Sequence, residues 1–246
     1  MPHQICPARL LLTGTITLLA CGMLRAEDTS APVGQPAWKL TAGRYFYGSG
    51  SPGNDLNLRY SAQDAHLWLG HFSQPGEDVG QWRAGWDQSV FERVRLQPSL
   101  QVASGGFAGG SVGLETGDQW YVGAGLGRTN LRPYYNLNFD PNDSYTLSAG
   151  WRGDDGSALG ALWVRDNRVN PDERHLHLMG QLPLPDRQRI SLDLLYKQGL
   201  VNDIMIQRLG ATLTYDWPTL FLRLAFDPQT NFTPVDAWRL SVGVRF

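Results

Sequence analysis

From Trp38 to the last residue, apolar and polar side chains alternate with a period of two, and no helical period interrupts them. Leu56, Leu58 and Tyr60, for example, are separated by single polar residues. A period of two places successive side chains on opposite faces of an extended strand. The region is therefore predicted to be all β-structure, with its two faces in different surroundings.

Fourteen candidate strands can be counted between residues 38 and 246. The number falls to twelve if the segment VFERVRLQP (90–98) is fused with a neighbour, or if GGSVGLE (109–115) is not a strand. Tight turns such as GDDGS (153–157) alternate along the chain with longer connections such as KQGLVND (197–203). We expect twelve to fourteen antiparallel strands, with short turns at one end and longer loops at the other.

Two β-architectures fit this alternation, and they place the apolar face differently. A soluble sandwich buries its apolar face, whereas a membrane barrel turns it outward to lipid and lines its lumen with polar residues. Glycines fall on the polar parity at mid-strand, as at Gly123, Gly125 and Gly127. Aromatic residues gather at strand ends, including the stretch from Tyr45 to Tyr47, which is typical of the girdles at membrane interfaces. The sequence therefore predicts a single antiparallel transmembrane β-barrel over residues 38–246, closed because an open edge in lipid is costly.

The first 26 residues have the order of a secretory signal peptide: a basic residue, a short apolar stretch and a small residue, Ala26. We expect cleavage there, followed by a short periplasmic segment (27–37). An alternative is lipidation of Cys21 within Leu18-Leu19-Ala20-Cys21-Gly22. Cys6 and Cys21 are the only cysteines, so a chain that begins at Glu27 has no disulfide and no thiolate metal site.

The charge of the exported chain argues against nucleic-acid binding. The whole sequence has 21 basic and 23 acidic residues, and the signal removes Arg9 and Arg25 and no acid, which leaves 19 against 23, or −4. Such a balance does not provide a general nucleic-acid surface.

The C-terminal sequence WRLSVGVRF resembles the assembly signal of Gram-negative outer-membrane β-barrel proteins. Its apolar parity ends on an aromatic residue, and the matching positions are Trp238, Leu240, Val242, Val244 and Phe246. The third residue from the end is often aromatic in that family and is Val244 here. The resemblance implies location in the outer membrane, contact with its lipid and lipopolysaccharide, recognition by the barrel-assembly machinery, and pairing of the last strand with the first, near Trp38 to Phe46. It does not identify an oligomeric state.

We find no catalytic or metal-binding motif known from such barrels. His66, His71, His175 and His177 lie in none of the segments of outer-membrane phospholipases, lipid A deacylases or omptin proteases. His175 and His177 share the inward face of one strand, and Ser148 and Asp193 lie on other strands. A histidine beside a carboxylate can act as a base, but polar lumen histidines explain the pattern more simply. Two alternate histidines without a third ligand are weak support for a metal, so no cofactor, no metal and no enzyme activity are expected.

The polar parity is rich in basic residues. On this assignment the lumen receives ten basic side chains, counting Lys197, against the acids Asp87, Glu115, Asp193 and Asp216. The other nine are the candidate pore-lining residues: Lys39, Arg59, Arg83, Arg95, Arg189, Arg208, Arg223, Arg239 and Arg245. Guanidinium groups in a narrow pore favour anions. Arginine-lined porins for acidic oligosaccharides resemble this lining, although no motif identifies the chain as one.

These residues predict a small outer-membrane pore with a positive lumen, for passive diffusion of small, preferably anionic solutes. Two alternatives stay open: a non-conducting structural or assembly-linked barrel plugged by ion pairs, and a lipid-modifying enzyme. The longest loop, RTNLRPYYNLNFDPND (128–143), either caps the barrel, folds inward as a constriction with Arg128 and Arg132 at its mouth, or contacts a partner outside.

Overall fold

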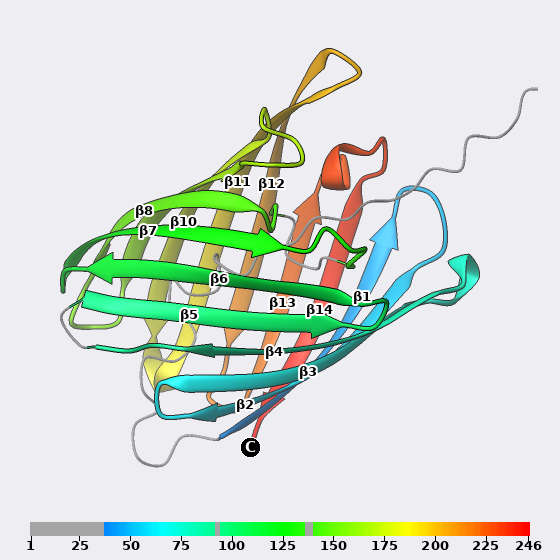
Figure 1. The fold of residues 1–246 in the computed structure, drawn as a ribbon. Coiled ribbons are helices and arrows are strands. Elements are labelled where there is room, and N and C mark those ends of the chain that lie inside the picture. The colour runs from blue at the N-terminus through cyan, green and yellow to red at the C-terminus, as the bar shows by residue number, and fades with distance from the viewer. Residues whose placement is uncertain (1–36, 92–93, 136–139) are drawn as a thin grey trace, which may run out of the picture.

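The computed structural model describes residues 37–91, 94–135 and 140–246. Within this part of the chain, fourteen antiparallel strands close into one barrel, each bonded to its neighbours in sequence (Figure 1). The predicted signal peptide (1–26) lies outside the described residues, as does the segment 27–37 except for its last residue. The upper end of the expected range of strand number is therefore correct.

The strands are β1 (Trp38–Tyr47), β2 (Gly53–Ala62), β3 (Ala65–Gln74), β4 (Val79–Gln88), β5 (Val94–Ala103), β6 (Phe107–Thr116), β7 (Trp120–Thr129), β8 (Ser144–Arg152), β9 (Ala158–Asp166), β10 (Arg174–Leu184), β11 (Gln188–Val201), β12 (Ile204–Asp216), β13 (Leu220–Asp227) and β14 (Ala237–Arg245). Three single-turn 3₁₀ helices lie between strands: η1 (Pro75–Glu77), η2 (Pro185–Arg187) and η3 (Thr230–Phe232). Among the described residues, none of the helices has the length and apolarity needed to cross a membrane.

The barrel is closed by β1 and β14. Their pairing runs from Lys39 opposite Arg245 to Tyr47 opposite Ala237. Beyond the strand ends, the backbones of Trp38 and Phe246 exchange two hydrogen bonds of 3.0 Å. The expectation that the last strand pairs with the first, near Trp38 to Phe46, is confirmed. Closure satisfies the backbone groups that an open edge would expose to lipid.

The outer face of the barrel is apolar and its inner face is polar. On β14, Trp238, Leu240, Val242 and Val244 are 43–49% exposed, whereas Arg239 is only 9% exposed. A protein in water would show the opposite distribution, because burying apolar surface and solvating charge both favour folding. The outer face therefore fits a lipid environment.

Aromatic residues do not all lie on the outer face. Tyr45 belongs to the stretch predicted as part of a girdle, yet it is 2% exposed and points inward near Arg239. Trp68 on β3 also lies on the inward parity, opposite Gly85 on β4. A Cβ at Gly85 would lie 2.5 Å from the Trp68 ring, so glycine is needed there for the indole to fit. The girdle prediction was therefore too broad, because composition at a strand end does not determine which face an aromatic residue occupies.

The two ends of the barrel differ in their connections. We call the end that holds Trp38 and Phe246 the terminal end, and the opposite end the loop end; the marked C-terminus identifies the former (Figure 1). The loop end carries the longest connection, residues 130–143, but it also carries short ones. The segment 197–203, predicted as a longer loop, is mostly strand, and β11 and β12 form a hairpin that projects beyond the barrel at this end (Figure 1). Asn202 and Asp203 close this hairpin with φ of 50° and 64°, the left-handed conformation of tight two-residue turns.

Candidate functional site in the barrel lumen

All nine candidate pore-lining side chains lie on the inward parity of their strands, and eight of them line the barrel interior. These eight are Lys39, Arg59, Arg83, Arg95, Arg189, Arg223, Arg239 and Arg245. Arg208 differs, because it is exposed and its guanidinium donates to the neighbouring Gln207 carbonyl. It belongs to the part of β12 near the projecting hairpin. There the side chains still alternate between the two faces of the strand, but these faces no longer correspond to lumen and exterior.

A band of charged side chains lines the lumen near the terminal end. We call it the terminal ring, and it consists of Lys39, Arg59, His66, Asp87, Arg95, Glu115, Arg152, Arg189, Asp216 and Arg245. All ten residues lie within four positions of the strand ends on that side of the barrel. The ring therefore contains six Lys or Arg side chains and three carboxylates.

Two of these carboxylates are each shared by two basic side chains. Asp87 lies 3.1 Å from Arg59 Nη2 and 2.7 Å from His66 Nδ1. Asp216 lies 3.3 Å from Arg189 Nη2 and 2.6 Å from Arg245 Nη2. Sharing lets basic residues outnumber acids while each arginine still has a carboxylate neighbour.

The third carboxylate follows the same rule. Glu115 is 2% exposed, pairs with Arg95, and lies 2.9 Å from Arg152 Nη2. Arg152 also stacks over the Tyr121 ring at 3.8 Å. The arginines in these pairs keep 14–25% of their side-chain surface exposed, so they remain accessible to water and small solutes in the lumen.

One aromatic ring gathers further positive charge at this end. The Phe221 ring is 1% exposed and lies 5.5 Å from Lys39 Nζ, 5.3 Å from the Arg223 guanidinium and 5.4 Å from that of Arg245. Cations are attracted to the negative face of an aromatic ring. Phe221 therefore helps to hold several positive groups close together.

The interior as a whole is less basic than the sequence indicated. Arg152 was missed, as were the inward acids Asp55, Asp166 and Asp227 at strand ends. With Arg208 removed and these added, the inward strand positions carry ten basic and seven acidic residues, instead of ten and four. Extending the period of two by one or two residues at the strand ends would have found the three acids, and Arg152 continues the parity of Ser144, Thr146 and Ser148 on its own strand.

Ion pairs near the loop end are much more deeply buried. Arg83 is 4% exposed and pairs with Asp55 across β2–β4. Lys197 is 1% exposed, and its Nζ lies 2.6 Å from Asp227. Phe232 of η3 covers the ammonium group at 5.3 Å. These charges stabilise the packed interior and are hardly accessible to a passing solute.

The long loop 130–143 is called the inward loop, because its described parts, residues 130–135 and 140–143, fold into the lumen. Gln81 of β4 binds its backbone: Tyr135 N–H donates to Gln81 Oε1 at 2.8 Å, and Gln81 Nε2 donates to Pro133 O at 3.0 Å. Tyr134 packs on Phe107 with ring centroids 4.5 Å apart. Burial raises the pKa of Tyr134 to about 12, despite the opposing charge of Arg83. Of the outcomes considered for this loop, inward folding is the one observed.

The inward loop has a second attachment on another wall. Asp140 is buried and contacts His175 Nδ1 at 2.6 Å and His177 Nε2 at 2.8 Å, both on β10. Burial by itself would raise the pKa of Asp140, but the charge of His177 and hydrogen bonds from both histidines hold it well below its usual value. Because β4 and β10 are six steps apart around the barrel one way and eight the other, the loop reaches two nearly opposite walls.

The structure also changes the interpretation of the paired histidines. Asp193 contacts His177 at 3.0 Å, as the enzyme alternative requires. In the described part of the chain, however, Ser148 Oγ makes no hydrogen bond, so no serine is activated by these histidines. Asp140 was missed as their partner because a sequence cannot show that a loop returns to the lumen.

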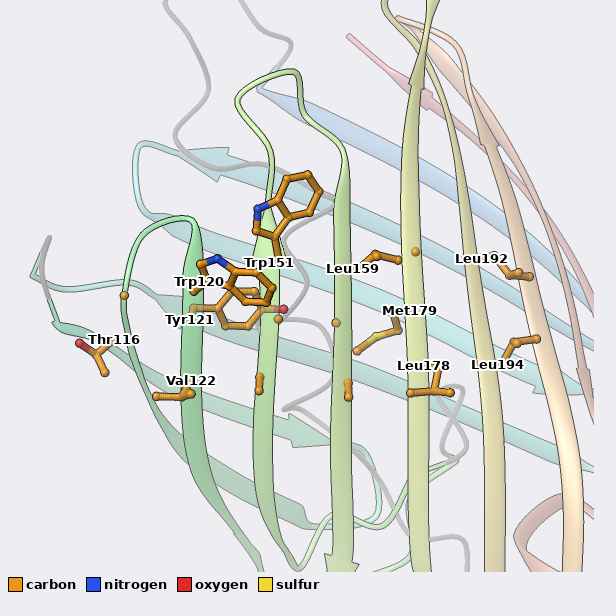
Figure 2. Close-up of a pocket in the computed structure, with 16 residues that line it drawn as sticks. Thr116, Trp120, Tyr121, Val122, Trp151, Leu159, Leu178, Met179, Leu192 and Leu194 are labelled. Carbon is orange, nitrogen blue, oxygen red and sulfur yellow. The ribbon is translucent and has the colours of Figure 1, made fainter.

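An apolar hollow lies on the outer side of β7–β11. Trp120, Trp151, Leu159, Leu178 and Leu192 surround it (Figure 2). They occupy the outward parity of their strands, the parity expected to face lipid. The hollow therefore lies on the outer wall, and Tyr121 and Met179 of the inward parity also contribute to its lining.

Comparison with known proteins identifies the fold. No protein-family model matches the sequence, and no curated protein matches it. The structure is similar to the outer membrane protein Omp33 of Acinetobacter baumannii, with a TM-score of 0.56 and 9% identity over 86% of this chain and 99% of that one. It is also similar to the NanC and KdgM porins, with 9% and 10% identity over 85% of this chain and 100% and 99% of theirs. Their TM-scores of 0.45 and 0.46 are too low to support an argument.

The likeness to Omp33 shows the fold of an outer-membrane β-barrel. Together with the apolar outer face, this fold is that of a barrel that spans a lipid membrane.

Proposed function

We propose that this outer-membrane β-barrel forms a small passive pore and that its lumen favours anions. The observation that carries the proposal is the terminal ring, in which six Lys or Arg side chains face three carboxylates. Counting only its Lys, Arg, Asp and Glu side chains, the ring has a net charge of +3. A ring of charge inside low-dielectric walls concentrates counter-ions and sets the selectivity of a pore.

The arginines of the terminal ring are suited to contact solutes. Their side chains are partly exposed, and a guanidinium has five N–H donors, more than a shared carboxylate can accept. Guanidinium groups bind carboxylates and phosphates through paired hydrogen bonds. Small solutes that carry such groups are the expected cargo, and the inward loop limits their size.

A non-conducting barrel is the second candidate. The buried pairs Arg83–Asp55 and Lys197–Asp227, together with the inward loop, favour a lumen that is filled near the loop end. Conductance separates the two candidates directly, because a plugged barrel carries no ions.

Purified barrel in a planar lipid bilayer, under a tenfold KCl gradient, tests the proposal. We expect the barrel to conduct ions, with a reversal potential that indicates preference for chloride over potassium. The double variant Arg95→Gln/Arg189→Gln should move the reversal potential toward potassium, because it removes two positive charges from the ring. Glu115 keeps Arg152 and Asp216 keeps Arg245, so no ring carboxylate loses both partners.

Arg208→Gln is the matched control, since it removes the same charge from the exposed part of β12. It should leave the reversal potential unchanged. Absence of conductance, or preference for potassium in the unchanged protein, would overturn the proposal.

A further inference from the structure

Three side chains able to bind a metal converge inside the barrel near the loop end. His175 and His177 occupy alternate positions of β10, so both rings point inward. Asp140 reaches them from the inward loop, with Oδ1 2.6 Å from His175 Nδ1 and 2.8 Å from His177 Nε2. The three ligand atoms lie within 4.8 Å of one another, and all three residues are buried.

The second ring nitrogen of each histidine faces another carboxylate. His175 Nε2 lies 3.2 Å from Glu173 Oε1, and His177 Nδ1 lies 3.0 Å from Asp193 Oδ1. When these carboxylates accept the ring N–H, the lone pairs of His175 Nδ1 and His177 Nε2 point toward Asp140. Histidines that bind a metal are oriented in this way by an outer carboxylate or carbonyl.

The cluster also has an excess of negative charge, which a bound cation would compensate. Asp140, Glu173 and Asp193 provide three negative charges around two imidazoles. The nearby Lys197 is already held by Asp227. One divalent ion, or a second proton on each imidazole, would supply the same compensation of +2.

We propose that Asp140, His175 and His177 bind one divalent transition-metal ion, with zinc as the probe. Two imidazole nitrogens and one carboxylate oxygen are a common ligand set for zinc, with bonds of about 2.0–2.2 Å. The four-coordinate ion then takes its remaining ligand from solvent or substrate. One ligand comes from the inward loop and two from the wall, so the bound ion fastens the loop to β10. This site is separate from the terminal ring and does not depend on conduction.

The test uses the full barrel, refolded in detergent without a histidine tag and freed of metal with a chelator. Equilibrium dialysis against zinc should give one bound ion per chain. Asp140→Asn and His177→Gln should each abolish this stoichiometric binding. Asp193→Asn should weaken it by about 10- to 100-fold, because it removes an outer partner. To check folding, each variant is run without heating on a detergent gel. The gel shows whether its barrel resists unfolding as the unchanged protein does.

His71→Gln is the matched control, because His71 lies on the outward parity of β3 beside Trp82. It should bind zinc like the unchanged protein. If His177→Gln fails to fold, Asp140→Asn still tests the site, since Asp140 is not part of a strand. Absence of zinc binding in the unchanged protein, which would mean that protons fill the cluster, overturns the proposal. So does undiminished binding in folded Asp140→Asn.

Discussion

At the scale of single residues, Glu115 shows how the lumen combines charge with stability. It is almost fully buried, yet it neutralises only part of the charge of Arg95 and Arg152. Removing a buried carboxylate that holds two cations leaves those cations uncompensated. The residue therefore links the selectivity of the ring to the stability of the barrel.

Glu115→Gln should make the pore more anion-selective and less stable. The substitution keeps the shape of the side chain and removes one negative charge, so the net charge of the ring rises. We expect the reversal potential to move further toward chloride, and the free energy of unfolding in urea to fall by about 1–3 kcal/mol, since both arginines are partly solvated. A move toward potassium would contradict the assignment of Glu115 to the lumen.

At the scale of elements, the two faces of β14 have different roles, one toward the lumen and one toward lipid. Its inward residues Arg239 and Arg245 belong to the lumen, and its outward residues face lipid. Phe246 continues the outward parity and is 60% exposed, so its ring adds little packing to the barrel itself. Its backbone, not its side chain, completes the pairing with Trp38. We propose that the ring acts in assembly, as the resemblance of the last strand implies.

Phe246→Ser should therefore reduce assembly in cells more than stability in vitro. We expect less folded barrel in the outer membrane, while refolding into detergent stays close to that of the unchanged chain. Quantitative gels of membrane fractions and of refolded protein measure the two effects. Phe91→Ser is the control, because Phe91 is also an exposed phenylalanine near the terminal end, at 72%. Equal loss in both variants would argue against a special role for Phe246.

At the scale of the whole molecule, we expect the inward loop to determine how much of the lumen stays open. It is held by Gln81 on one wall and by His175 and His177 on another. Loosening either attachment should widen the path for ions without changing the barrel. The loop thus separates a packed loop end from a more accessible terminal end.

Gln81→Leu should raise conductance and increase current fluctuations, because it removes both bonds from the side chain to the loop backbone. Single-channel recording measures both quantities. Gln74→Leu is the matched control: Gln74 donates to Ser51 in a different connection at the same end, at 2.7 Å. If both variants conduct alike, the inward loop does not limit the flow.

Much of the fold follows from the sequence because side chains along each strand of a barrel in lipid alternate between an apolar outer face and a polar lumen. The period of two from Trp38 to Phe246 predicted strands and their apolar outer face, and the resemblance of the last strand to an assembly signal implied the pairing of β14 with β1. The period of two also placed all nine candidate basic residues on the inward parity, and eight of them line the barrel interior. One error arose at Arg208, where the hairpin leaves the barrel and alternation no longer separates lumen from exterior. Another arose at Tyr45, which was assigned to a girdle from composition although its parity points inward.

The candidate sites depended on contacts between distant parts of the chain. Alternation predicted that Arg95 faces inward and missed Arg152, and only the closed barrel shows that both share Glu115. Likewise, His175 and His177 were visible as a pair, while Asp140 joined them only when the loop entered the lumen. The sequence by itself determined which face each side chain takes, because that depends on neighbours along one strand. The tertiary structure decided which charges meet, because that depends on strand register and on the course of a loop that no local pattern encodes.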